Sequence, residues 1–359
     1  MDYYVAEYQI VEGTAKTAGT KARDDVGNIL NSLNIKQITI PANMTDRESL
    51  PKFEKIKFHI DVLRKWGEAL SVLKKGDRVI IQFPNIEHSV FLPLLFGRLK
   101  SKGIKIIFLI HDLELLRRGK RTDVSFSSKL RTRLEENNAL RAGEKIIVHN
   151  RKMLQYMIQL GFPAEKLINL RIFDYLIPDY DEKRMAQRKI DKNLPIIIAG
   201  NLRRHKAAYV YELDDTAEFN LFGIGYDGRN DDQIHYLGAR EPDDLPCGME
   251  GSFGLVWDGE STQTCSGAFG EYLRINNPHK VSLYLVSGIP VIIWDQAALA
   301  SFIRHYNCGI TVSSLSEIKE RVSSMSEEEY RTMKKNAGRI GTRLRNGYYT
   351  KKALEKAEG

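Results

Sequence analysis

Cysteine is scarce in this sequence. Its three cysteines, Cys247, Cys265 and Cys308, lie far apart, and no C-x-x-C pair or Cys/His cluster occurs. Such spacing favours neither a zinc site nor a disulfide framework, so we expect no bound metal and a reducing, cytoplasmic environment.

Long apolar runs are also missing. No apolar stretch approaches the roughly 18 residues that a membrane-spanning helix needs. The first seven residues, MDYYVAE, lack both the basic and the apolar segment of a secretion signal. These absences predict a soluble protein of the cytoplasm.

Several motifs that would identify a common enzyme class are absent. There is no G-x-S-x-G, no H-E-x-x-H, and no G-x-G-x-x-G after the first expected strand. The segment 13–21, GTAKTAGTK, is not a Walker loop, because its second glycine comes one residue too late and is followed by Thr20 and Lys21 instead of Lys-Ser/Thr. A P-loop ATPase and a dehydrogenase are therefore disfavoured. We expect this loop, with Thr20 and Lys21, to contact an acceptor substrate.

What is present is the composition of a folded, mildly basic protein. Hydrophobic residues make up 42% and charged residues 28%, and 54 basic against 46 acidic side chains give a net charge of +8. This charge suits a phosphate-bearing ligand, an anionic membrane surface or nucleic acid. Nucleic acid is the weakest of the three, since no recognised motif or aromatic-rich basic strand accompanies the charge.

Apolar strand-like runs alternate with amphipathic helical stretches along the chain, which predicts parallel α/β sheets with crossover helices. Residues 174–194 interrupt this alternation with Pro178 and a charged run. We therefore expect two Rossmann-like domains facing a cleft, at 1–173 and 195–326, joined by a linker at 174–194. Residues 327–359 are predicted to form basic helices that pack back on the first domain.

The most informative segment is residues 276–292, NNPHKVSLYLVSGIPVI. Asn277 suits an N-cap and Pro278 the first helical position, whereas Gly288 suits the C-terminal end. The pattern predicts a helix of about nine residues that leads into a strand. Its N-terminus, together with Lys280, would bind a diphosphate; the alternative is a capped helix with a solvated lysine.

Three further strand ends in the second half carry candidate nucleotide ligands. Gly200 is followed by a basic turn that contains Arg203 and Arg204, with Arg203 favoured as a phosphate ligand over a simple solvated turn. Asp258 ends another strand and either binds the nucleotide sugar or closes its own turn. Tyr226 ends a third and either stacks on a base or is an ordinary edge tyrosine.

One strand end in the first half suggests proton transfer. His111 and Asp112 directly follow the apolar run 104–110. The histidine would act as a general base and the aspartate would orient its ring, unless the pair only closes a turn.

Several of these segments together resemble a known family. The residues 110–114 (IHDLE), 147–150 (IVHN), 251–259 (GSFGLVWDG) and 277–280 (NPHK) are similar to those of bacterial GT-B glycosyltransferases often labelled β-1,6-galactofuranosyltransferases. This group is related to streptococcal glucosyltransferases that act on O-linked GlcNAc of serine-rich-repeat adhesins. The resemblance covers nearly the whole chain.

The resemblance implies a GT-B fold and transfer of a hexose from a UDP-sugar to a saccharide acceptor, lipid-linked or protein-linked, without a cofactor or metal. It implies diphosphate contacts from Lys280 and Arg203 or Arg204, a nucleotide contact near Leu283, an acceptor contact near Thr20, and a homo-oligomer. One departure is notable: the two glutamates seven residues apart of better-known GT-B enzymes are absent, with only Glu271 nearby.

Two alternatives stay open from the sequence. A sugar-nucleotide epimerase would use the same two-domain scaffold, and a non-enzymatic binding protein would use only the basic charge. Peripheral contact with the inner face of the cell membrane is a further expectation, through the basic stretches 117–121 and 334–345.

Overall fold

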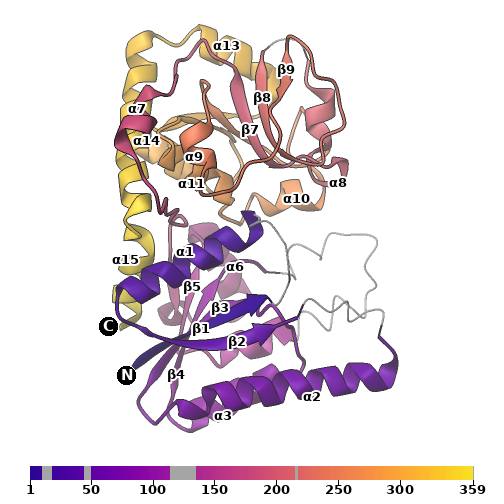
Figure 1. The fold of residues 1–359 in the computed structure, drawn as a ribbon, viewed down its shortest axis with the longest axis vertical. Helices are drawn as coiled ribbons and strands as arrows, with labels where there is room; N and C mark the ends of the chain where they lie inside the picture. Colours follow the sequence, from indigo (N-terminus) through magenta and orange to yellow (C-terminus); the bar gives the residue numbers. More distant parts are fainter. Residues whose placement is uncertain (10–17, 44–49, 114–134, 215–216, 359) are drawn as a thin grey trace.

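The computed structural model describes the chain except for residues 10–17, 44–49, 114–134, 215–216 and 359. It contains two six-stranded sheets, with strand orders β2-β1-β3-β4-β5-β6 and β12-β11-β10-β7-β8-β9, in which every paired strand runs parallel. The two sheets belong to an N-terminal and a C-terminal domain, stacked along the long axis of the molecule (Figure 1). This confirms the α/β fold of two Rossmann-like domains.

The N-terminal domain surrounds the first sheet with helices that cover both faces. Its β3 strand, Arg-Val-Ile-Ile-Gln-Phe, is buried almost throughout and rich in β-branched residues, as a central parallel strand requires. Its strands are β1 (Asp2–Gln9), β2 (Lys36–Ala42), β3 (Arg78–Phe83), β4 (Lys105–Ile110), β5 (Lys145–Val148) and β6 (Leu167–Asn169); its helices include α1 (Ala18–Ser32), α2 (Lys52–Ala69), α3 (Leu92–Ser101) and α6 (Arg151–Gln159).

The C-terminal domain is built on the second sheet in the same way. Its strands are β7 (Ile196–Asn201), β8 (Phe219–Ile224), β9 (Ile234–Tyr236), β10 (Gly254–Val256), β11 (Val291–Trp294) and β12 (Gly309–Val312). Its helices include α8 (Arg204–Ala207), α9 (Leu245–Gly248), α10 (Gly267–Tyr272), α11 (His279–Val286), α12 (Ala300–Tyr306) and α13 (Ile318–Ser323), and α7 (Glu182–Gln187) precedes the domain. A continuous apolar core joins the two domains through Ile172, Phe173, Tyr175 and Ile177.

The last two helices return from the C-terminal to the N-terminal domain (Figure 1). Helix α14 (Glu327–Arg345) begins with a capping box between Ser326 and Glu329 and packs on α11, and α15 (Tyr348–Glu358) contacts β5, β6 and α1. Glu358 of α15 forms an ion pair of 3.0 Å with Arg78. The chain therefore crosses between the domains twice, which ties their relative positions together.

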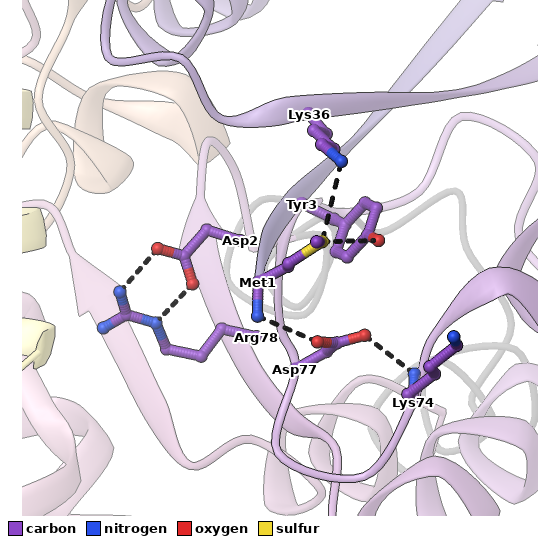
Figure 2. Close-up of polar contacts among 7 residues, drawn as sticks. All are labelled: Met1, Asp2, Tyr3, Lys36, Lys74, Asp77 and Arg78. Carbon is purple, nitrogen blue, oxygen red and sulfur yellow. Dashed lines mark hydrogen bonds and ion pairs between the residues drawn. The ribbon is translucent and has the colours of Figure 1, made fainter.

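Ion pairs join β1 and β3 at the end of the first sheet where these strands begin, close to α15. Figure 2 shows Arg78 on β3 donating to both carboxylate oxygens of Asp2 on β1, at 2.8 and 2.7 Å. The amino group of Met1 donates to Asp77 at 2.8 Å, and Asp77 also accepts from the backbone of Lys74. These contacts lie at the starts of the strands, so the ends of the strands stay free to form a site.

The structure differs from the sequence expectations in a few elements. Strand β6 and helix α7 are additional: β6 is only three residues long, and α7 lies in the expected linker, where Asp181 caps the charged run. The basic stretch 117–121 lies outside the described residues. The stretch 334–345 lies on α14, where Lys334 donates to the carbonyl of Ile190, so this lysine already has a protein partner. Among the described residues, no helix is long and apolar enough to cross a membrane.

Asp174 links the domain crossover to α15 and makes folding sensitive to pH. Its carboxylate is buried and accepts hydrogen bonds from the backbone of Tyr349 (3.2 Å) and Thr350 (2.6 Å), in the first turn of α15. Burial raises the pKa of Asp174 from 3.8 to about 7. Between these two values the folded protein holds a proton that the unfolded chain has lost, so this contribution to stability is present at low pH and lost as the pH rises through about 7.

We therefore expect Asp174→Asn to destabilise the protein more at pH 5 than at pH 8. The difference in unfolding free energy between wild type and variant should shrink by more than about 1 kcal/mol over this interval. Equilibrium urea unfolding at both pH values measures it, with Asp179→Asn, a nearby exposed aspartate, as the matched control. A difference that is constant with pH would contradict this assignment.

Candidate functional site

The carboxyl ends of the strands in the second sheet bring several candidate residues together. The strand order reverses between β10 and β7, which is where open parallel sheets bind ligands. Gly200 lies near the end of β7, and Asp258 follows β10 by two residues. Lys280 approaches both of them from the first turn of α11.

Lys280 is the basic centre of this edge. Its ammonium donates to Oδ1 of Asp258 at 2.9 Å, and both side chains are largely buried. Gly200 has a φ of +128°, and a Cβ there would lie 3.1 Å from Cε of Lys280. The glycine therefore gives the lysine side chain room to cross β7.

Asn277 does not cap α11, contrary to the sequence expectation. The helix begins at His279, and Pro278 occupies the N-cap position. The Asn277 side chain instead donates to the carbonyl of His149 (2.6 Å) and accepts from Asn150 (2.8 Å) in the N-terminal domain. Asn277 is thus held at the domain boundary and fixes the direction from which α11 enters the site.

The other C-terminal candidates lie on a more exposed part of the same edge. Arg203 packs its side chain against Gly225, and within the described residues its guanidinium forms no ion pair. Arg204 stacks 3.8 Å above the ring of Tyr211 and pairs with Asp227 at 3.5 Å. This geometry favours Arg203 over Arg204 as the cation available to a ligand.

Tyr226 and Leu283 have different surroundings. The ring of Tyr226 lies 5.1 Å from that of Tyr211 and 5.3 Å from that of Tyr236, and its hydroxyl donates to the carbonyl of Arg229. Tyr226 is therefore part of an aromatic cluster at the ends of β8 and β9. Leu283 is buried on α11, one turn after Lys280.

His111 in the N-terminal domain faces the domain boundary. Its ring stacks on Phe173, with centroids 5.3 Å apart and planes 10° from parallel. Nε2 of His111 lies 2.6 Å from Oε1 of Gln82 on the adjacent strand β3. The sequence suggested Asp112 as the hydrogen-bond partner of the His111 ring. In the structure the partner is Gln82 instead.

Asp112 serves the contact between the domains. Its Oδ1 accepts from the backbone of Leu113 at 3.1 Å, and its carboxylate is hydrogen-bonded to Tyr272 of α10. The Tyr272 hydroxyl also accepts from the Leu113 backbone at 3.1 Å. Asp112 thus helps to hold the segment that carries His111 against the C-terminal domain.

Three histidines from both domains surround Phe173. Besides the stacked His111, the rings of His149 and His279 are T-shaped to that of Phe173, with centroids 4.9 and 6.3 Å away. Burial lowers the pKa of His149 and of His279 to about 4, and it lowers the pKa of His111 well below its usual 6.5. All three imidazoles are therefore neutral at pH 7.

Lys21 and Thr20 lie on α1. The Lys21 ammonium pairs with Asp25 at 2.6 Å and, across the domain boundary, with Asp243 at 2.7 Å. It also donates to the carbonyl of Leu176 at 2.8 Å. These contacts neutralise the charge of Lys21 and connect the two domains. We therefore do not propose Lys21 as a ligand of the acceptor. Thr20 is half-buried at the start of the helix, and residues 13–17 of the same loop lie outside the described residues.

Sequence reasoning missed the residues that join the two domains. Asn150 caps α6 through its side-chain oxygen, which accepts from the backbone of Lys152 and Met153, and its amide nitrogen donates to Ile275 and Asn277. Gln82 was also missed, although a lone amide inside an apolar strand is a detectable signal. Within the described residues, no three potential metal ligands gather at one place.

Comparison with known proteins gives matches along almost the full chain. Residues 3–172 match the profile of the glucosyltransferase 3-like N-terminal domain, and residues 196–357 match that of the C-terminal domain. β-1,6-Galactofuranosyltransferase WbbI of Escherichia coli K12 is 37% identical over 95% of this chain and 94% of its own length. Glucosyltransferase 3 of Streptococcus gordonii is 27% identical over 82% of this chain and 83% of its own length.

Solved structures share the fold at much lower identity. HepE of Anabaena, solved in complex with UDP and glucose, superposes with a TM-score of 0.59 at 13% identity, covering 100% of this chain and 99% of its own. At this level of identity the likeness concerns the fold alone, and it confirms the expected GT-B architecture.

Proposed function

The chain belongs to the glucosyltransferase 3-like family of GT-B glycosyltransferases, and from this premise we propose that it transfers a hexose from a UDP-sugar to a saccharide acceptor. The sugar is glucose, galactose or galactofuranose. WbbI, which is similar along 95% of the chain, is named a galactofuranosyltransferase, and the streptococcal relative is named a glucosyltransferase.

The observation that carries this proposal is the position of Lys280. Its buried ammonium and the first-turn N–H groups of α11 meet at the switch point of the second sheet, beside Gly200. A helix N-terminus with a lysine in its first turn is suited to a diphosphate, the group that leaves when a sugar is transferred from UDP. Arg203 supplies a second cation from the neighbouring turn.

We propose that these basic groups, and not a metal ion, balance the charge on the departing UDP. Fixed cations aimed at the leaving group stabilise charge as it develops in the transition state. Activity should then persist in the presence of EDTA.

His111 is proposed as the general base on the acceptor side. It lies in the N-terminal domain at the domain boundary and is neutral at pH 7. Its ring stacks on Phe173, and the ring of Phe173 in turn contacts His279 at the start of α11. A base in this place would take the proton of an acceptor hydroxyl in an inverting transfer. Thr20 is proposed to lie near the acceptor.

A panel of UDP-glucose, UDP-galactose and UDP-galactofuranose with GlcNAc- and glucose-terminated acceptors tests the proposal. Release of UDP and a product heavier than the acceptor by one hexose are expected with one of the donors, with and without EDTA. An epimerase would convert the donor without an acceptor and without UDP release, and this result would overturn the proposal.

A further inference from the structure

Gln82 is the single amide within the apolar strand β3, and the residue is 7% exposed. The strand register pairs it with Leu109 of β4, two residues before His111, so Gln82 and His111 lie on the same side of the sheet. A buried amide needs hydrogen-bond partners, and Gln82 finds one of them in the imidazole of His111 at 2.6 Å.

The orientation of the Gln82 amide is set by its second contact. Its Nε2 donates to the backbone carbonyl of Arg23 on α1 at 3.3 Å. Oε1 therefore faces His111, and because this oxygen can only accept, Nε2 of His111 must carry the ring proton. Nδ1 then holds the lone pair, and within the described residues it has no hydrogen-bond partner.

We propose that Gln82 is the positioning residue of the general base, since it holds His111 in the tautomer whose Nδ1 accepts the acceptor's proton. This inference rests on the proposed function. In the transfer step, Nδ1 takes the hydroxyl proton while the acceptor oxygen bonds to the anomeric carbon. The bond from that carbon to the UDP oxygen breaks, and its electron pair leaves with UDP.

The surroundings of the imidazole fit this role. Burial disfavours a positive charge on His111 most, and Arg23 on α1 adds to this; His149 after β5 and His279 on α11 add to it only where they are protonated themselves. The neighbouring Asp112 is engaged by Leu113 and Tyr272. Gln82 adds no charge. The neutral ring is therefore kept as an acceptor well below pH 6.5, and the neutral amide fixes its tautomer without raising its pKa as a carboxylate would.

Two substitutions separate these effects. Gln82→Glu keeps an acceptor opposite Nε2 but adds a negative charge, so it should move the acid limb of the kcat/KM profile upward by about 1 to 2 pH units. Gln82→Met removes the acceptor at similar volume, so kcat should fall by about 10- to 100-fold with KM changed less than about 3-fold. Gln37→Glu and Gln37→Met, on the exposed face of β2, are the matched controls.

The tautomer of His111 can be determined without measuring enzyme activity. Long-range ¹⁵N–¹H spectra of histidine-labelled wild type, with His111→Asn used for assignment, should show the proton of His111 on Nε2. A proton on Nδ1 would overturn the inference even if neither variant folds. So would a Gln82→Glu profile that coincides with that of wild type together with a Gln82→Met kcat within twofold. A wild type that transfers no sugar from any donor would instead overturn the proposed function.

Discussion

Lys280→Ala is expected to lower kcat/KM for the UDP-sugar by roughly 100-fold or more, because it removes the buried cation that would face the diphosphate. The first turn of α11 would keep its N–H groups, so binding should be weakened and not abolished. Initial rates of UDP release over a range of donor concentrations measure the loss. Lys319→Ala, an exposed lysine on α13, is the control and should behave as wild type.

The variant also leaves Asp258 without its lysine, and an unpaired buried carboxylate would itself repel a diphosphate. The double variant Lys280→Ala/Asp258→Asn separates the two effects. If the lost cation is responsible, activity stays low in the double variant. Recovery to near the wild-type rate would show that repulsion by Asp258 caused the loss, and the diphosphate role of Lys280 would be wrong.

His111→Ala is expected to lower kcat by about 10²- to 10⁴-fold, the usual contribution of a general base, while the Kd for UDP stays within about 3-fold of wild type. The reason is that His111 belongs to the N-terminal domain, whereas the proposed UDP ligands belong to the C-terminal domain. Single-turnover rates and UDP titrations measure the two quantities separately.

His305→Ala, an exposed histidine on α12, is the matched control. A His111→Ala enzyme with kcat within tenfold of wild type would contradict the role of His111 as a base. It would favour a mechanism in which the sugar keeps its anomeric configuration and no such base is required.

The sequence predicts the features of the fold that depend on residues close to one another along the chain. The short helix before β11 could be placed because Gly288, with a φ of +70°, ends it and Pro290 prevents its continuation. Lys280 could be selected because it lies at the start of that helix. The alternation of strands and helices predicted both sheets, since inner strands such as β4 and β11 are apolar over nearly their whole length.

Contacts between distant residues could not be predicted in the same way. Asn277 has the chemistry of an N-cap, but Asn150 and His149 of the other domain compete for its side chain, and the helix begins two residues later. Lys21 has the chemistry of a ligand, but Asp243 neutralises it across the domain boundary. In both cases a tertiary contact engages a side chain for which the local sequence suggests a different partner.

His111 shows an intermediate case. Its place after an apolar strand predicted a role at a strand end, and the adjacent Asp112 was the natural choice of partner. Neighbouring residues in a strand-like segment point apart, whereas Gln82 on the paired strand β3 points to the same side. The partner of a residue at a strand end is therefore better sought in the neighbouring strand than in the next position of the chain.

The most direct test of the account is calorimetric titration of the wild-type protein with UDP, GDP and ADP in the presence of EDTA. The proposed site predicts that UDP binds without a metal and about 10-fold or more tighter than the other two nucleotides. Equal affinity for the three nucleotides, or loss of UDP binding when EDTA is added, would contradict a metal-independent UDP-sugar site at Lys280.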